Sequence, residues 1–293
     1  MTYGLFRLLL RAIRAIPPSV LYAFARFLGL LFWHCSASRR RMATAAVQKH
    51  LNLPADESRR IARQSFKENF HSFFEIFHVA DFFIKTSVEA CYSPETVAML
   101  QAENAPIVIA TAHLGSWELM PGLAPDTVPE RESMVIVRSR RSSSIDRIMA
   151  EMRGARGMLV VPHRQASSVV LPKLRAGGVA SFLVDHNCSR KEAVFLPFFN
   201  DTAAVNVGPA GMALRTKASV YPVFLLRNGK GKHILHILPP LQTTNLSGSI
   251  NERLRKISRF YTNAVEALVR QYPEQWFWMH QRWKTREKKE PEN

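Results

Sequence analysis

Short β-rich runs alternate with helical stretches from Pro106 onward. The runs cover residues 107–112, 134–138, 158–162, 179–185, 220–226 and 233–239. Helical stretches at 143–155, 165–176 and 207–217 separate several of them. This alternation is typical of a mostly parallel central sheet flanked by helices. We therefore predict an α/β fold whose site lies in the loops that follow the carboxyl ends of the strands.

The region before the sheet is basic and α-rich. Residues 1–67 hold twelve Lys and Arg but only two acids, so they supply +10 of the net charge of +17. Helices are predicted over residues 40–51 and 56–79, and another over 250–272 near the end of the chain. A strongly basic chain has an anionic partner: nucleic acid, a membrane surface or an acidic substrate.

An apolar segment at residues 15–38 has Arg26 as its one charge. Arginines flank it on both sides: Arg7, Arg11 and Arg14 before it, and Arg39, Arg40 and Arg41 after it. A secretory signal peptide is disfavoured because three arginines directly follow the small residues. A membrane-spanning helix and a helix lying in the membrane plane both remain open, with a buried core helix as the third alternative. We expect residues 1–38 to contact a membrane, with residues 39–293 as one α/β domain on its cytoplasmic face.

Aromatic side chains share one face of the predicted helix 56–79. Phe66, Phe70, Phe73, Phe74 and Phe77 recur at spacings of three and four, which indicates a core face. His71, Glu75 and His78 lie on an adjacent face, where a polar edge or a buried pair is favoured over a metal site. We predict no metal.

The composition excludes several classes of protein. With 47% hydrophobic residues the chain is too apolar to be disordered. Its three cysteines are far apart and form no CxxC pair, so neither a disulfide framework nor a zinc module is expected. No nucleic-acid-binding module is present, and we disfavour a nucleic-acid partner.

The first loop after a strand, residues 110–120, holds a candidate acid–base pair. His113 directly follows an apolar run, and Glu118 lies five residues later. If a helix starts at Ser116, Glu118 can reach back to the imidazole and fix its tautomer, so that the other ring nitrogen acts as a base. A structural loop histidine is the alternative. The chain has no G-x-S-x-G elbow, Walker A loop or G-x-G-x-x-G fingerprint, so no nucleotide cofactor is expected.

Other candidate binding residues follow later strands. Arginines cluster between Arg138 and Arg156, including Arg140, Arg141 and Arg153, and suit either phosphate binding or a solvated basic face. Asp185 ends the fourth run. Gly208 precedes a small-residue helix whose N-terminus could hold a phosphate or the thioester-bearing arm of a donor, or could be an ordinary helix start.

Four blocks, in order, resemble the lipid A biosynthesis acyltransferase family. The blocks are AHLGSWE (112–118), VIVR (135–138) with RGARG (153–157), LVDHN (183–187) with residues 196–224, and PEQWFWMHQRWKTR (273–286). AHLGSWE corresponds to the H-x4-D/E motif of that family. The resemblance begins in the basic, apolar N-terminus and extends over nearly the whole chain.

The resemblance implies an O-acyltransferase with no cofactor. His113, paired with Glu118, would deprotonate a hydroxyl of a lipid A precursor, and the oxygen would attack an acyl thioester. The donor would be acyl carrier protein or coenzyme A, and the acceptor a phosphorylated glycolipid. Arg138 is the candidate for phosphate or oxyanion binding, Arg153 and Gly208 are further substrate-binding candidates, and Asp185 would support the acceptor site. Another glycolipid or a lysophospholipid as acceptor, and a non-catalytic lipid-binding relative, are the alternatives.

Overall fold

The structure is a computed structural model, and it describes residues 10–80, 88–91, 94–102, 105–138, 144–228 and 232–288. Three helices come first: α2 (Pro18–Cys35), α3 (Ala37–Leu51) and α4 (Ala55–Glu75). Pro18 begins α2 at a position where a helix needs no N–H donor. Asn52 ends α3 in the left-handed region, with φ of 55°. The short turn η1 (Ile76–His78) follows α4.

The remaining elements alternate between strands and helices. The strands are β1 (Val88–Cys91), β2 (Ile107–Thr111), β3 (Ser133–Val137), β4 (Leu159–Pro162), β5 (Val179–Leu183), β6 (Ala193–Phe198), β7 (Asp201–Asn206), β8 (Ser219–Arg227), β9 (His233–Ile237) and β10 (Leu241–Gln242). The helices are α6 (Pro94–Ala102), α7 (Ala124–Thr127), α8 (Ser144–Arg153), α9 (Leu171–Arg175), α10 (Gly208–Thr216) and α11 (Ile250–Gln271). Short helical turns are η2 (Met120–Leu123), η3 (His163–Gln165), η4 (Ala166–Val170), η5 (Arg190–Glu192), η6 (Thr243–Asn245) and η7 (Pro273–Gln275).

The central sheet has the strand order β1-β9-β8-β2-β5-β3-β4, and β10 pairs with β8 outside this path. Strands β8, β2, β5, β3 and β4 run parallel to one another. Strands β9 and β10 are antiparallel to β8. The predicted α/β class, with a mostly parallel sheet flanked by helices, is confirmed. The hairpin of β6 and β7 was not predicted, since its sequence alternates poorly.

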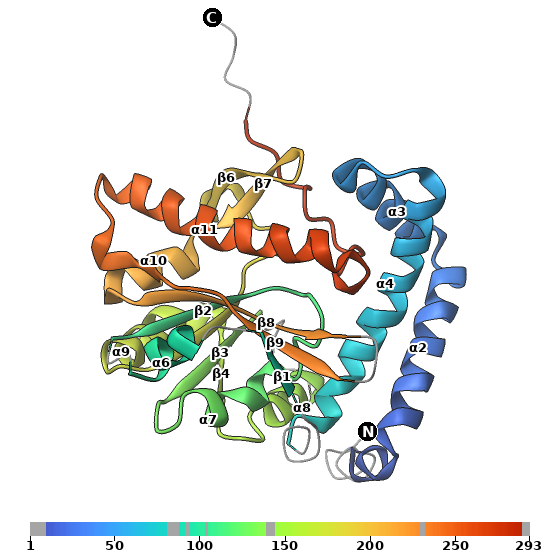
Figure 1. The fold of residues 1–293 in the computed structure, drawn as a ribbon, viewed down its shortest axis with the longest axis horizontal. Coiled ribbons are helices and arrows are strands. Elements are labelled where there is room, and N and C mark those ends of the chain that lie inside the picture. The colour runs from blue at the N-terminus through green and yellow to red at the C-terminus, as the bar shows by residue number, and fades with distance from the viewer. Residues whose placement is uncertain are drawn as a thin grey trace, which may run out of the picture.

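The two faces of the sheet pack into different cores because side chains alternate along each strand. On β2, Val108 and Ala110 join the core beneath α9, α10 and α11. Ile107 and Ile109 face the other way, into the core covered by α6, η2, α7 and α8. Figure 1 shows α10 and α11 on one side of the sheet and α7 and α8 on the other.

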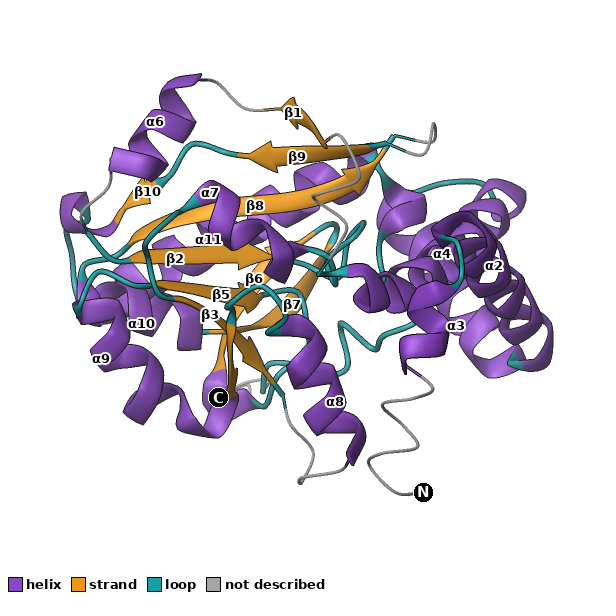
Figure 2. Cartoon of the chain, turned by 90° about the horizontal axis from the view of Figure 1, so that it is seen from below, coloured by secondary structure: helices purple, strands orange, loops and turns teal. Residues whose placement is uncertain are grey.

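Helices α2, α3 and α4 form a separate layer at one end of the sheet, and the arrowheads of β2 and β8 point toward it (Figure 2). Helix α2 packs closely on α4 at Gly29, where a Cβ would lie 2.6 Å from the carbonyl oxygen of Phe66. Helix α4 in turn touches the C-terminal segment, since the Asn69 side chain donates to the carbonyl oxygen of Trp276 (3.1 Å). The helical layer therefore covers the edge at which the parallel strands end.

Helix α2 is apolar on its outer as well as its inner side. Leu21, Ala25, Gly29 and Trp33 are buried. Val20, Phe24, Phe27 and Leu31, which we name the α2 stripe, are 48–59% exposed. In the described part of the chain no single helix meets the length and hydropathy needed to cross a membrane. Helices α2 and α3 meet these criteria only as a pair, bent by 97°.

Candidate active site

The loop after β2 carries His113 and is fixed by residues from the end of the chain. Gly115 has φ of +65°, and a Cβ there would lie 2.3 Å from the carbonyl oxygen of Leu225, so only glycine fits. The Gly115 N–H donates to the carbonyl oxygen of Gln275 (3.1 Å), and the Phe277 N–H donates to the carbonyl oxygen of His113 (3.0 Å). These contacts set the position of His113 at the carboxyl end of β2.

Asp185, which lies just beyond β5, binds His113 twice. Its Oδ1 lies 2.9 Å from Nδ1 of the imidazole, and its Oδ2 accepts from the backbone N–H of His113 at 3.0 Å. Trp276 donates its Nε1–H to the same Oδ2 (2.8 Å). The carboxylate is fully buried. A buried carboxylate at Nδ1 stabilises the tautomer in which Nε2 carries no proton, so Nε2 is the ring nitrogen available as a base.

His113 and Asp185 shift each other's pKa values in opposite directions. Burial lowers the pKa of His113, but the charge of Asp185 and its hydrogen bond outweigh burial and hold this pKa above its ordinary value. Burial raises the pKa of Asp185, but His113 and Trp276 hold it well below its usual range. Asp185 is therefore a permanent carboxylate beside the imidazole.

Glu118 binds a different partner from the one expected. Its carboxylate accepts two hydrogen bonds from Arg153, from Nε at 2.9 Å and from Nη2 at 2.6 Å. The expected contact with the imidazole is not formed, because a turn rather than a helix follows Ser116 and the Glu118 side chain points to α8. This corrects the predicted pairing: Asp185 orients His113, and Glu118 holds Arg153. The structure places Asp185, the candidate for supporting the acceptor site, against His113 and Trp276.

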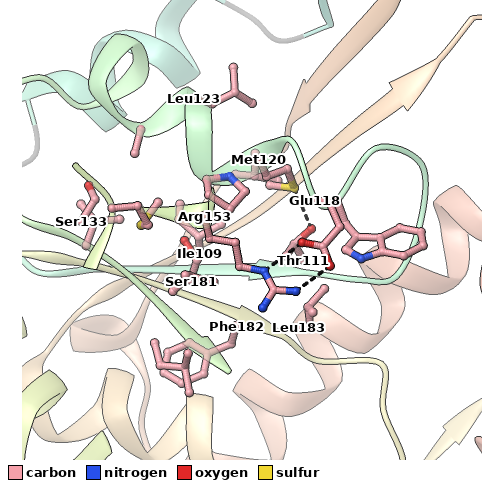
Figure 3. Close-up of a pocket in the computed structure, with 18 of the residues that line it drawn as sticks. Ile109, Thr111, Glu118, Met120, Leu123, Ser133, Arg153, Ser181, Phe182 and Leu183 are labelled. Atoms are coloured by element: carbon pink, nitrogen blue, oxygen red, sulfur yellow. Dashed lines mark hydrogen bonds and ion pairs between the residues drawn. The ribbon is translucent and has the colours of Figure 1, made fainter. Parts of the chain in front are cut away.

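A cavity of about 410 Å³ opens beside these groups. His113, Glu118 and Arg153 line it together with mostly apolar side chains. Alternate residues of neighbouring strands form one wall: Ile109 and Thr111 of β2, Ser181 and Leu183 of β5, and Val135 and Val137 of β3. Figure 3 shows Met120 and Leu123 opposite that wall and the Arg153–Glu118 pair at one end. The cavity is large enough, and apolar enough, for an elongated hydrocarbon group.

The other predicted binding residues lie at different distances from this cavity. Arg138 lines it and is exposed. Gly208 is not one of the residues that line it, and its N–H donates to Oδ1 of Asn206 (2.7 Å), so this N–H already has an acceptor from its own chain. Arg140 and Arg141, like Arg7 near the N-terminus, lie outside the described residues.

A buried ionic cluster connects the loop that carries His113 to α4. Arg227 donates from Nε to Glu68 (2.9 Å), and from Nη1 to Glu75 (3.0 Å), Ser72 (3.1 Å) and Ser116 (2.8 Å). Ser116 donates its hydroxyl to Glu75 (2.9 Å). Burial raises the pKa of Glu75, but Arg227 outweighs burial and lowers it to about 2. Glu75 is thus part of a buried pair, the reading that its helical spacing favoured.

Sequence reasoning missed Arg227 and Trp276, and it did not place Ser116 in a buried ionic cluster. The sequence does hold a signal for Arg227, because this arginine directly follows the apolar run 220–226. In the structure the whole of β8, including Arg227, is buried. Glu68, Ser72 and Glu75 are spaced by four and three along α4 and so share a face that could have received it. No local pattern marks Trp276 as the second partner of Asp185.

Known proteins resemble this chain in sequence. The chain matches the bacterial lipid A biosynthesis acyltransferase family over residues 2–285. It is 29% identical over 119 residues to the lipid A biosynthesis lauroyltransferase of Escherichia coli K12. The matched segment covers 40% of this chain and 37% of that protein. It is 31% identical over 117 residues to the lipid A biosynthesis acyltransferase of Haemophilus influenzae. This match covers 40% of this chain and 35% of that protein.

A third relative acts on a different lipid. The phosphatidylinositol mannoside acyltransferase of Mycolicibacterium smegmatis is 25% identical over 186 residues, which is 60% of this chain and 56% of that protein. The matched segments thus span between about a third and just over half of these curated relatives. Because the family match extends over nearly the whole length, the chain belongs to the bacterial lipid A biosynthesis acyltransferase family.

Proposed function

We propose that the protein transfers a fatty acyl chain from an acyl thioester to a hydroxyl of a lipid A precursor. The observation that carries this proposal is an imidazole held at Nδ1 by Asp185 beside an apolar cavity of about 410 Å³. Acyl transfer to an alcohol needs a base for the hydroxyl proton and an apolar site for the chain. Both requirements meet at His113.

The transfer itself follows from the roles of the ring nitrogens. Nε2 of His113 takes the proton of the acceptor hydroxyl as its oxygen attacks the thioester carbonyl. The tetrahedral intermediate collapses with loss of the thiolate, to which the imidazolium returns the proton. Asp185 stabilises the imidazolium through Nδ1. No covalent acyl-enzyme is formed, and no metal or cofactor is required by these steps.

Arg153 supplies positive charge to the same site. It lines the cavity and is oriented by two hydrogen bonds to Glu118. A guanidinium fixed in this way is suited to the oxyanion that develops on the thioester carbonyl or to an acidic group of a substrate. Glu118 then acts through Arg153, and Arg138 at the rim takes a phosphate of the acceptor.

The acyl chain of the donor occupies the apolar cavity. One wall of the cavity is built from strand residues and the opposite side from η2. The length of the cavity is therefore set by rigid elements. We further propose that the donor is carried by acyl carrier protein, because an acidic carrier complements a chain of net charge +17.

The α2 stripe is proposed to dock on the cytoplasmic face of the inner membrane. It is apolar and exposed, and Arg11, Arg14, Arg39 and Arg41 flank the helix. An apolar face between cations suits an anionic bilayer surface, with α2 lying in the membrane plane against α4. Sedimentation with anionic vesicles tests this proposal, and full recovery of the protein in the supernatant would contradict it.

A second acceptor class is favoured by one comparison. The match to the mycobacterial phosphatidylinositol mannoside acyltransferase covers 60% of the chain. A glycolipid acceptor other than a lipid A precursor is therefore the second candidate.

The test is an acyl transfer assay with the full chain, acyl carrier protein charged with a fatty acid, and a phosphorylated glucosamine lipid in anionic vesicles. Mass spectrometry of the extracted lipid is expected to show the mass of one added acyl chain. A parallel assay with a phosphatidylinositol mannoside separates the two acceptor classes. Absence of product from either lipid, with both acyl carrier protein and coenzyme A thioesters, would refute the proposed function.

A further inference from the structure

One side of α4 carries three phenylalanines whose rings follow one another along the helix. Phe70 lies 6.0 Å from Phe73 between ring centroids. Phe74 adjoins them at the spacing of one helical turn from Phe70. Phe70 and Phe74 are half-buried, and Phe73 is 38% exposed. We name Phe70, Phe73 and Phe74 the α4 ridge.

The α4 ridge reaches the catalytic histidine at one end. Phe73 packs edge-on against Trp117 (5.7 Å) and Phe277 (5.8 Å). These two rings flank His113, at 5.6 Å and 6.0 Å from the imidazole. Phe73 also lines the cavity while remaining exposed. The ridge and the cavity therefore meet at His113, one on the outside of the molecule and the other inside it.

At its other side the α4 ridge continues into α2. Phe70 lies 5.5 Å from Phe32, and Phe74 lies 6.2 Å from Phe24. Phe24 belongs to the α2 stripe, and Phe32 beside it is 38% exposed. An unbroken series of aromatic rings thus connects the apolar outer side of α2 to the imidazole.

Cations gather beside the ridge. Arg63 and Lys67 lie on the line along α4 that continues through Phe70 and Phe74, at spacings of four, three and four residues. Burial lowers the pKa of Lys67, and the charges of Arg26 and Arg63 lower it further, while Glu68 raises it. The ammonium of Lys67 donates to Oε1 of Gln64 (2.7 Å). Arg26 pairs with Glu68 at 3.3 Å, but that carboxylate is also bound by Arg227. The basic flank of the ridge therefore consists of Arg63 and Lys67 on α4 and Arg26 on α2, and the carboxylate that Arg26 contacts is shared with Arg227.

An anionic lipid complements this combination of an apolar ridge and a basic flank. Resting on the proposed function, we propose that the α4 ridge is the acceptor track: the hydrocarbon chains of the lipid acceptor lie along Phe70, Phe73 and Phe74. A second anionic group of the acceptor, distinct from the phosphate at Arg138, lies toward Arg63 and Lys67. The acceptor hydroxyl then reaches His113 from the outside, whereas the donor chain reaches it from the cavity. Two lipid substrates that must meet at one base each have their own apolar surface.

Kinetics of the full chain with two variable substrates test this assignment. The variants are Phe70→Ser, the conservative Phe70→Leu, and Phe74→Ser as an independent change on the ridge. Ile250→Ser is the matched control, because Ile250 is 61% exposed at the start of α11. The substrates are acyl carrier protein thioester and a phosphorylated glucosamine lipid in anionic vesicles. Thermal unfolding and vesicle sedimentation are measured for every variant.

The proposal predicts a split between the two substrates. Phe70→Ser and Phe74→Ser should each raise KM for the lipid acceptor about tenfold, the effect of removing a partly buried phenyl ring from an apolar contact. KM for the thioester and vesicle binding should stay within about twofold. Phe70→Leu should restore most of the loss, and Ile250→Ser should behave as the unsubstituted protein.

Three results would overturn the acceptor track. In the first, both serine variants keep the unsubstituted KM for the lipid. In the second, KM rises equally for the two substrates, as a distorted site would cause. In the third, vesicle binding falls in proportion to KM, which would make the ridge a membrane-docking surface only. If the unsubstituted chain transfers nothing to the lipid, the proposed function fails as well, so the two failures are distinguishable.

Discussion

Oδ1 of Asp185 lies 2.9 Å from Nδ1 of His113, although 72 residues separate them in the sequence. The contact exists because β5 is the neighbour of β2 in the sheet, so the residues that follow the two strands meet at one edge. In this arrangement Asp185 contacts the imidazole of His113, and Glu118 binds the guanidinium of Arg153.

Asp185→Asn should slow acyl transfer by about 10³-fold, because the amide no longer fixes the imidazole tautomer. The raised pKa of His113 depends on the charge of Asp185. Removing that charge lowers this pKa, so the acid limb of the kcat/KM profile should move to lower pH. A pH–rate profile checks both effects, and an unmoved acid limb would show that another group sets the basicity of His113.

Glu118 and Arg153 should behave as one unit. Glu118→Gln and Arg153→Met should each slow transfer by about 10²-fold, and the double variant should be no slower than either single one. Arg153→Lys should not rescue, since an ammonium cannot replace a bidentate guanidinium. Asp126→Asn is the control, because its pair with Arg156 is half-exposed. Additive losses in the double variant would separate the two roles.

Ser116→Ala should disturb the catalytic loop without touching the substrates. It removes the bonds to Glu75 and Arg227 and leaves two buried charged groups with one partner fewer. The free energy of unfolding should fall by about 1–3 kcal/mol, and kcat should fall while KM for the thioester stays unchanged. Ser168→Ala, in an exposed turn, is the matched control. Chemical denaturation and steady-state kinetics measure the two effects. A stable variant with full kcat would refute a positioning role for the buried cluster.

Gly115→Ala should be far more damaging than Gly157→Ala. Both glycines have positive φ, but a Cβ at Gly115 meets the Leu225 carbonyl at 2.3 Å, while nothing lies within 4 Å of one at Gly157. Strain from φ alone costs about 1 kcal/mol or more at either position. The additional loss of stability at Gly115, seen as a lower Tm, measures the close approach of the loop to β8. Equal losses would show that this approach does not constrain the loop.

Much of the fold could be predicted because local patterns contain it. Runs such as 107–112 and 179–185 became β2 and β5, and the helix predicted over 56–79 became α4 and η1. The hairpin of β6 and β7 was missed because residues 193–206 hold Pro197 and a left-handed Phe199, which interrupt the alternation of a strand.

Some residues of the candidate site could be singled out from the sequence, but their pairings could not. His113, Glu118, Arg153 and Asp185 all stand at or near the ends of elements, which made them candidates. Their partners depend on the order of the strands and on how α8 packs beside them, and neither is a property of a short sequence window. Spacing within a loop favoured Glu118 for the imidazole, whereas the tertiary arrangement brings Asp185 there.

The most direct test of the account is acyl transfer by His113→Ala. The variant should keep its Tm and its binding to anionic vesicles, because His113 lies at the cavity and not in the core. Transfer to the lipid acceptor, followed by mass spectrometry, should fall by at least about 10³-fold, the scale of losing a positioned base. Transfer within tenfold of the unsubstituted rate would contradict His113 as the general base.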